Sequence, residues 1–215
     1  MTMQTRATIL LTLAALAAAG PAAPARAEIT IDGYTSWASN GNPSSYTFNA
    51  GGSDKLVVVV SGEHNFPGNY TGDVYSVKYD GQLLTKAVEQ APSSALSIQT
   101  TSDIWYLDNP WQYTTAGTVV VSVNGNGTNY VYTAVGLSNT APGVGATAHV
   151  SGAASVSMTT TAADSMVIFN LGTGGSGNTA AGTNTILPNS PAGALQIGGI
   201  VSSGNYAGQS VARAT

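Results

Sequence analysis

The stretch Leu56-Val57-Val58-Val59-Val60 is an unbroken run of large apolar residues. A strand with one face in water alternates apolar and polar residues, whereas a continuous apolar run is typical of a strand that is covered on both faces. We therefore expect this segment to lie in the middle of a sheet, with other parts of the chain packed on each side of it.

The rest of the chain after residue 28 shows almost no helical periodicity. Short β-branched or aromatic runs recur instead at intervals of about ten residues, bounded by Gly, Asn, Asp and Pro. This pattern predicts an all-β fold, an antiparallel two-sheet β-sandwich with the jelly roll as the candidate topology. The predicted strands are Ile29–Thr35, Ser45–Phe48, Leu56–Ser61, Val74–Tyr79, Gln82–Val88, Leu96–Thr100, Asp103–Leu107, Thr118–Val123, Tyr130–Leu137, Ala148–Thr160, Met166–Leu171, Asn184–Leu187 and Leu195–Ser203.

Two turns between these strands are specified by their residues. Asp80-Gly81 lies between alternating runs, and Asp-Gly is favoured where both central residues of a type I′ hairpin turn need a positive φ. Asn124-Gly125-Asn126-Gly127 has the same chemistry, so we expect it to join the strands on either side of it in a second hairpin.

We expect one domain over residues 28–215. Within it the Gly/Ser/Thr-rich part around 172–193 is interpreted as a long, flexible surface loop rather than a linker between domains. A last short strand over Gln209–Ala214 would close the sandwich, whereas a missing strand would leave an unpaired sheet edge.

The first 27 residues have the pattern of a secretory signal peptide. Arg6 precedes the apolar run 7–19, and Ala25-Arg26-Ala27 places small residues where a signal peptidase requires them. Thirteen residues of helix span about 20 Å, short of a hydrocarbon core of about 30 Å, so we expect cleavage before Glu28 rather than membrane anchoring. The predicted location is secreted, either extracellular or periplasmic.

The composition excludes several classes of function. Ten acidic residues face only four basic ones after residue 27, so binding to nucleic acid or to an anionic membrane surface is not expected. The chain has no cysteine, which excludes disulfides, thiol catalysis and thiolate metal sites. Without disulfides, the fold must depend on its hydrophobic core.

Three stretches are informative when they are taken together: Val77-Lys78-Tyr79-Asp80-Gly81-Gln82-Leu83-Leu84-Thr85, Ile104-Trp105-Tyr106-Leu107-Asp108-Asn109-Pro110 and Val135-Gly136-Leu137-Ser138-Asn139-Thr140. They resemble a β-sandwich module of uncharacterised bacterial exported proteins, many of them members of the PEP-CTERM group. The resemblance implies export to the cell envelope and an association with exopolysaccharide, and it covers roughly residues 56–203. The chain shows no Pro-Glu-Pro, C-terminal apolar helix or terminal arginine cluster, so the resemblance does not extend to membrane sorting by that route.

No catalytic constellation stands out, and we expect no enzymatic activity. The chain has two histidines, His64 and His149, and no Gly-x-Ser-x-Gly elbow for a serine nucleophile. Glu63 and His64 are adjacent, so on a strand they point to opposite faces and cannot chelate one zinc ion together. Paired carboxylates for glycoside hydrolysis are not singled out by any spacing.

Two kinds of binding site are candidates. No cofactor is implied by the sequence. Loops of exported β-sandwiches often bind calcium through carboxylates, and the candidate ligands are Asp73, Asp103 and Asp108. Aromatic rings that can stack on sugars, next to amide groups, occur in two loops and form a candidate glycan-contact site of Phe66, Tyr70, Trp111 and Tyr113. The simpler alternative is that Trp111 and Phe66 cover the ends of the sandwich core.

These observations predict a secreted, non-enzymatic β-sandwich protein of the cell envelope or extracellular matrix. It would act through contacts with polysaccharide or with envelope proteins. The alternative is a glycan-binding module that is accessory to a carbohydrate-active enzyme.

Overall fold

The structure is a computed structural model that describes residues 28–39, 43–65, 74–90, 98–112, 116–123, 129–149, 157–161, 165–174, 195–203 and 207–214. In these residues the chain is built from β-strands, and the one helical element is the 3₁₀ turn η1 (Pro110–Gln112). The strands are β1 (Thr30–Ser39), β2 (Ser44–Asn49), β3 (Lys55–Asn65), β4 (Val74–Tyr79), β5 (Gln82–Leu83), β6 (Thr85–Gln90), β7 (Ile98–Asp108), β8 (Ala116–Val123), β9 (Asn129–Ser138), β10 (Val167–Gly174), β11 (Leu195–Ser203) and β12 (Ala207–Ala214).

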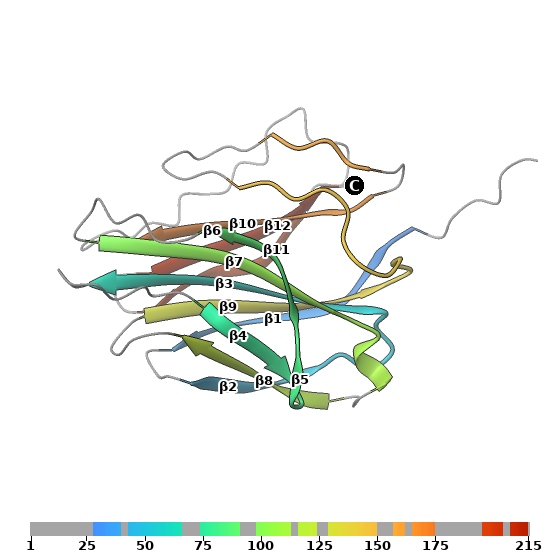
Figure 1. Cartoon of the computed structure of the whole chain (residues 1–215), viewed down its shortest axis with the longest axis horizontal. Helices are drawn as coiled ribbons and strands as arrows, with labels where there is room; N and C mark the ends of the chain where they lie inside the picture. Colours follow the sequence, from blue (N-terminus) through green and yellow to red (C-terminus); the bar gives the residue numbers. More distant parts are fainter. Residues whose placement is uncertain are drawn as a thin grey trace, which may run out of the picture.

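Two antiparallel sheets pack face to face, which confirms the predicted all-β sandwich (Figure 1). One sheet has the order β1-β9-β3-β7-β6 and the other has the order β2-β8-β4-β5. The strands β1 to β4 alternate between the two sheets, and so do β7 to β9. Nine strands thus form the two sheets of the sandwich, and the alternation of successive strands between packed sheets is typical of the jelly roll, the candidate topology.

The apolar run lies in β3, the middle strand of the five-stranded sheet, as its composition predicts. Leu56, Val58 and Val60 point into the core between the two sheets. Val57 and Val59 point to the opposite face and join a second cluster of buried residues. Both faces of β3 are therefore covered, and each of these five side chains is at most 5% exposed.

A third sheet, with the order β10-β12-β11, covers the second face of β3. In Figure 1 it lies on the side of the five-stranded sheet that is remote from β2, β8 and β4. The strand β10 packs against β3 and β7, while β11 packs against β1 and β9. The predicted strand Gln209–Ala214 is therefore present as β12, but it forms the centre of this third sheet and does not close the sandwich.

The predicted hairpin at Asp80-Gly81 is confirmed. Asp80 and Gly81 have φ values of 47° and 83°, and Tyr79 pairs with Gln82 across the turn. Beyond it, the single predicted strand Gln82–Val88 is wrong, since β5 and β6 belong to different sheets. The break falls at Leu84, whose side chain is 2% exposed and whose N–H donates to the Val77 carbonyl, so this residue forms a corner between the sheets.

Other predicted elements differ from the structure. The two strands predicted at Leu96–Thr100 and Asp103–Leu107 form one strand, β7. A hairpin between β8 and β9 is wrong because the two strands lie in different sheets. The apolar side chains of β8 and β9 face each other across the core between the sheets. Two strands that are neighbours in one sheet lie side by side and cannot face each other in this way. The described parts of the predicted strand Ala148–Thr160 are not extended in a sheet.

Several predictions lie outside the described residues. These are the signal peptide 1–27, the turn at 124–127, the strand at 184–187 and most of the loop predicted around 172–193. The described part of that loop, 172–174, is the end of β10.

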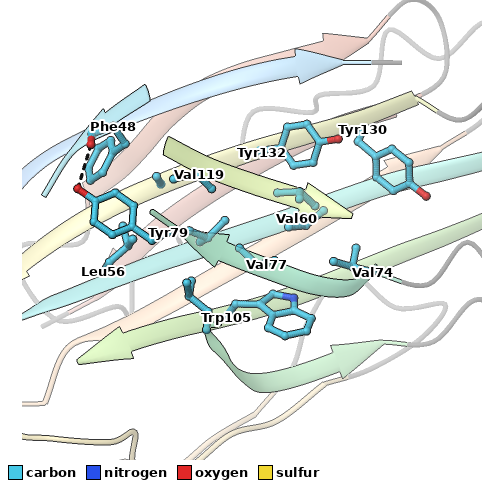
Figure 2. Packing of buried hydrophobic residues seen from close by; sticks show 14 of the residues in the cluster. Phe48, Leu56, Val60, Val74, Val77, Tyr79, Trp105, Val119, Tyr130 and Tyr132 are labelled. Atoms are coloured by element: carbon cyan, nitrogen blue, oxygen red, sulfur yellow. Dashed lines mark hydrogen bonds between the residues drawn. The ribbon is translucent and has the colours of Figure 1, made fainter. Parts of the chain in front are cut away.

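One buried tyrosine organises the polar groups of the core (Figure 2). The Tyr79 hydroxyl donates to the Phe48 carbonyl and accepts from the Gly117 N–H at 2.9 Å and from the Ala50 N–H at 3.4 Å. It thereby satisfies backbone groups of β2, of β8 and of the residue that follows β2, all of which would cost free energy if they were buried without partners.

The third sheet makes a testable prediction about β3. Val59→Ser should lower the free energy of unfolding by about 2–3 kcal/mol, because it removes buried apolar surface and places a hydroxyl among Val57, Val135 and Leu137. Val58→Ser, on the sandwich side, should cost a similar amount. Urea denaturation monitored by circular dichroism measures both.

The matched control is Val120→Ser, since Val120 is only half-buried on the outer face of β8. This change should cost less than about 1 kcal/mol. A Val59→Ser variant as stable as the Val120→Ser variant would contradict a covered second face.

Candidate functional site

The described residues include three of the seven predicted site residues. Trp111, Asp103 and Asp108 are placed by the structure, and Phe66, Tyr70, Tyr113 and Asp73 lie outside the described residues.

Trp111 lies on the surface at the end of β7. It is the middle residue of η1 and is 49% exposed, whereas the preceding Pro110 is buried. Trp111 belongs to neither cluster of buried residues that the described chain forms. The simpler alternative, in which Trp111 covers the core, is therefore not supported at this residue. The indole offers an exposed aromatic face to a ligand.

Backbone hydrogen bonds hold the turn that carries Trp111. Asn109 adopts a positive φ of 51°, and its N–H donates to the carbonyl of Asp54 at 2.6 Å. The Gln112 N–H closes the turn on the Asn109 carbonyl at 3.1 Å. The indole is thus presented on a preorganised base, which lowers the ordering cost of binding.

An ion pair between Lys55 and Asp108 lies next to this turn, since Asp108 directly precedes Asn109. Lys55 is 5% exposed, and its ammonium group donates to Asp108 Oδ1 and, at 2.8 Å, to the Gly143 carbonyl. The Gly143 N–H donates to Asp108 Oδ2 at 2.8 Å. The Lys55 Nζ also lies 5.0 Å from the centroid of the Tyr106 ring. Both carboxylate oxygens of Asp108 therefore have protein partners.

Two further carboxylates tie the neighbouring loops to the same end of the sandwich. Asp54 Oδ2 accepts the Asn139 N–H at 2.7 Å. Asp32 Oδ2 accepts the hydroxyls of Ser53, at 2.6 Å, and Ser138, at 2.7 Å. We call this set the polar end cluster, and its members are Asp32, Ser53, Asp54, Lys55, Asp108, Ser138, Asn139 and Gly143.

Of the four predicted glycan-contact residues, Trp111 is the one that lies within the described ranges. Trp111 follows β7, whose last residue Asp108 pairs with Lys55, the first residue of β3. Trp111 therefore lies beside the polar end cluster.

Asp103 and Asp108, the two predicted calcium ligands that the structure describes, do not lie together in one site. Asp103 and Asp108 lie five residues apart on β7, so their side chains point to opposite faces and their Cα atoms are about 17 Å apart. Nowhere in the described ranges do three or more His, Asp or Glu side chains come close enough to hold a metal ion.

A charged group on β6 and β7 was missed by sequence reasoning. Asp103 is fully buried, and in the register of β6 and β7 it lies opposite Glu89. Lys86 lies opposite Trp105 in the same register. The Lys86 Nζ lies 3.1 Å from the Glu89 carboxylate and 4.9 Å from the centroid of the Trp105 ring. The register shift between Lys86 and Val88 turns Lys86 and Glu89 to the same side, so strict alternation along β6 could not reveal this group.

An aromatic cluster lies between β1, β2 and β9. The rings of Trp37 and Tyr46 stack with centroids 3.6 Å apart, and Tyr132 lies 5.9 Å beyond Tyr46. Burial raises the pKa of Tyr132 to about 12, against the smaller lowering effect of its hydrogen bond with Ser44. Burial and the neighbouring Tyr132 raise the pKa of Tyr46 well above its ordinary value.

Comparison with known proteins leaves the chain without an assigned relative. No family model, curated protein or solved structure matches it. Within the part of the chain that the structure describes, no helix has the length and apolar character needed to cross a membrane.

The tyrosine cluster predicts a loss of stability in alkali. The unfolded chain releases the Tyr132 proton near pH 10, whereas the folded chain keeps it until about pH 12. The stabilising contribution is therefore complete below pH 10 and is lost as the pH rises from 10 to 12, by up to about 3 kcal/mol. Tyr46 acts in the same direction. Urea denaturation at a series of pH values above 9 measures this slope.

Tyr132→Phe should reduce the fall of the free energy of unfolding between pH 10 and pH 12. Tyr75→Phe is the control because Tyr75 is 57% exposed. Equal slopes for the native protein and the Tyr132→Phe variant would show that Tyr132 does not couple folding to pH.

Proposed function

We propose that the protein is a secreted, non-enzymatic component of the cell envelope or extracellular matrix, and that it acts through contacts with polysaccharide or protein. The observation that carries this proposal is the half-exposed Trp111 on a turn that the polar end cluster holds in place. An indole face stacks on the apolar face of a sugar ring, and a rigid base keeps the ordering cost of binding low.

The surface chemistry of the sandwich supports the same function. The outer face of the four-stranded sheet exposes Ser45, Thr47 and Asn49 from β2 and Thr118 from β8. In the sequences of these four strands, Lys78 is the one charged residue. A hydroxyl- and amide-bearing surface with little charge suits a neutral, hydroxyl-rich partner better than a polyanion.

Export is supported by the sequence of residues 1–27, and the link to exopolysaccharide by the resemblance of residues 56–203 to envelope proteins. The alternative function is a glycan-binding module accessory to a carbohydrate-active enzyme. Trp111 serves either function, and the two differ in the partner that is found with the protein.

Substitution of Trp111 tests the contact. Trp111→Ala should weaken binding to a responsive polysaccharide by about tenfold or more, because truncating a tryptophan at the centre of a contact costs roughly 1–2 kcal/mol or more. A glycan array followed by polysaccharide pull-down measures the effect. The control is Tyr75→Ala, which removes an aromatic side chain of similar exposure from the outer side of β4. Equal binding by the Trp111→Ala variant and the native protein would remove Trp111 from the proposed site.

Cell fractionation tests the proposed location. The protein should be recovered with the envelope or matrix fraction, with Glu28 as its first residue. Recovery only as free periplasmic protein, with no bound polymer or protein, would contradict the matrix role. Co-purification with a glycoside-degrading enzyme would favour the alternative.

A further inference from the structure

We propose that Lys55 and Asp108 become joined by an amide bond between the lysine Nζ and the aspartate Cγ. This covalent cross-link would connect β3 to β7, and it does not depend on the proposed function. The argument rests on the placement of the two side chains, on the backbone groups around them and on the low solvent exposure of the lysine.

The register of the sheet brings the two residues together. Lys55 begins β3, Asp108 ends β7, and the two are directly paired. The Lys55 side chain is 7% exposed, and its Nζ contacts Asp108 Oδ1. A long, flexible side chain is thus held against one carboxyl group, and holding reactants in this way can supply much of the barrier reduction for a reaction between them.

Gly143 supplies the two backbone groups that the condensation needs. Its carbonyl accepts from the Lys55 Nζ at 2.8 Å and so orients the amine. Its N–H donates to Asp108 Oδ2 at 2.8 Å, where negative charge develops when the carboxyl carbon is attacked. The Nζ lies 5.0 Å from the centroid of the Tyr106 ring, and the low exposure of the Lys55 side chain leaves the amine little contact with water.

The reaction is a condensation that balances without an oxidant or reductant. A proton first moves from the ammonium to Asp108 Oδ1, which converts the ion pair to an amine and a carboxylic acid. The amine attacks Cγ, an N–C bond forms, and the charge on Oδ2 is stabilised by the Gly143 N–H. A second proton moves from the nitrogen to Oδ1, the C–Oδ1 bond breaks and one water molecule leaves.

The second lysine–carboxylate pair provides an internal comparison. Lys86 and Glu89 are 24% and 38% exposed, and they lie three residues apart on the same strand. Lys86 therefore has access to water that Lys55 lacks, and we expect this pair to remain an ion pair.

Intact-mass spectrometry of the purified full chain under denaturing conditions tests the cross-link. The native protein should be lighter, by one water molecule, than the mass calculated for its sequence from the N-terminus that peptide sequencing identifies. Tandem mass spectrometry should find a branched peptide that contains Lys55 and Asp108. A native protein with the full calculated mass would overturn the proposal.

Variants distinguish this cross-link from another source of water loss. Asp80-Gly81 could lose water by cyclising to a succinimide, but that loss would persist in Lys55→Arg. The cross-link predicts that Lys55→Arg and Asp108→Ala restore the full mass and that Lys86→Arg keeps the deficit. A deficit that persists in Lys55→Arg would overturn the proposal. The native mass decides the question even where a variant fails to fold.

Discussion

Burial of β3 on both faces is the constraint on which the rest of the structure depends. Leu56, Val58 and Val60 need a sheet on one side, and Val57 and Val59 need a cover on the other. The four-stranded sheet provides the first and the sheet of β10, β12 and β11 provides the second. Since β3 is central, its neighbours β9 and β7 are fixed beside it in one register.

At the ends of the strands, backbone groups have no partner in the sheet and need other hydrogen-bond partners. At the end where β3 begins, the carboxylates of Asp54 and Asp108 accept the N–H groups of Asn139 and Gly143. Deeper in, the Tyr79 hydroxyl does the same for the Gly117 N–H and the Phe48 carbonyl. These contacts leave Trp111 exposed on a fixed turn, which connects the packing of the fold to the proposed contact with a ligand.

Sequence reasoning succeeded where the deciding interaction is local. The Asp80-Gly81 turn depends on the backbone preferences of two residues, and the double burial of β3 on the composition of five. It failed at Leu84, where the chain leaves one sheet for the other, because a buried leucine at a corner looks like any strand leucine. The separation of β8 from β9 was missed for a similar reason, since both strands have the alternation of a hairpin.

The candidate site divides in the same way. The aromatic and amide composition after β7 indicated Trp111, but not that it would lie on a turn bonded to the polar end cluster. The partnership of Lys55 with Asp108 and Gly143 joins residues up to 88 positions apart, and no local pattern encodes it.

By itself, the sequence determined the all-β class, the central double-faced strand and the tight turn at Asp80-Gly81, because side-chain periodicity and backbone preference act over a few residues. Only the tertiary structure decided the strand order, the third sheet and the setting of Lys55. These depend on which distant surfaces bury each other most completely, and that choice is made by the whole chain at once.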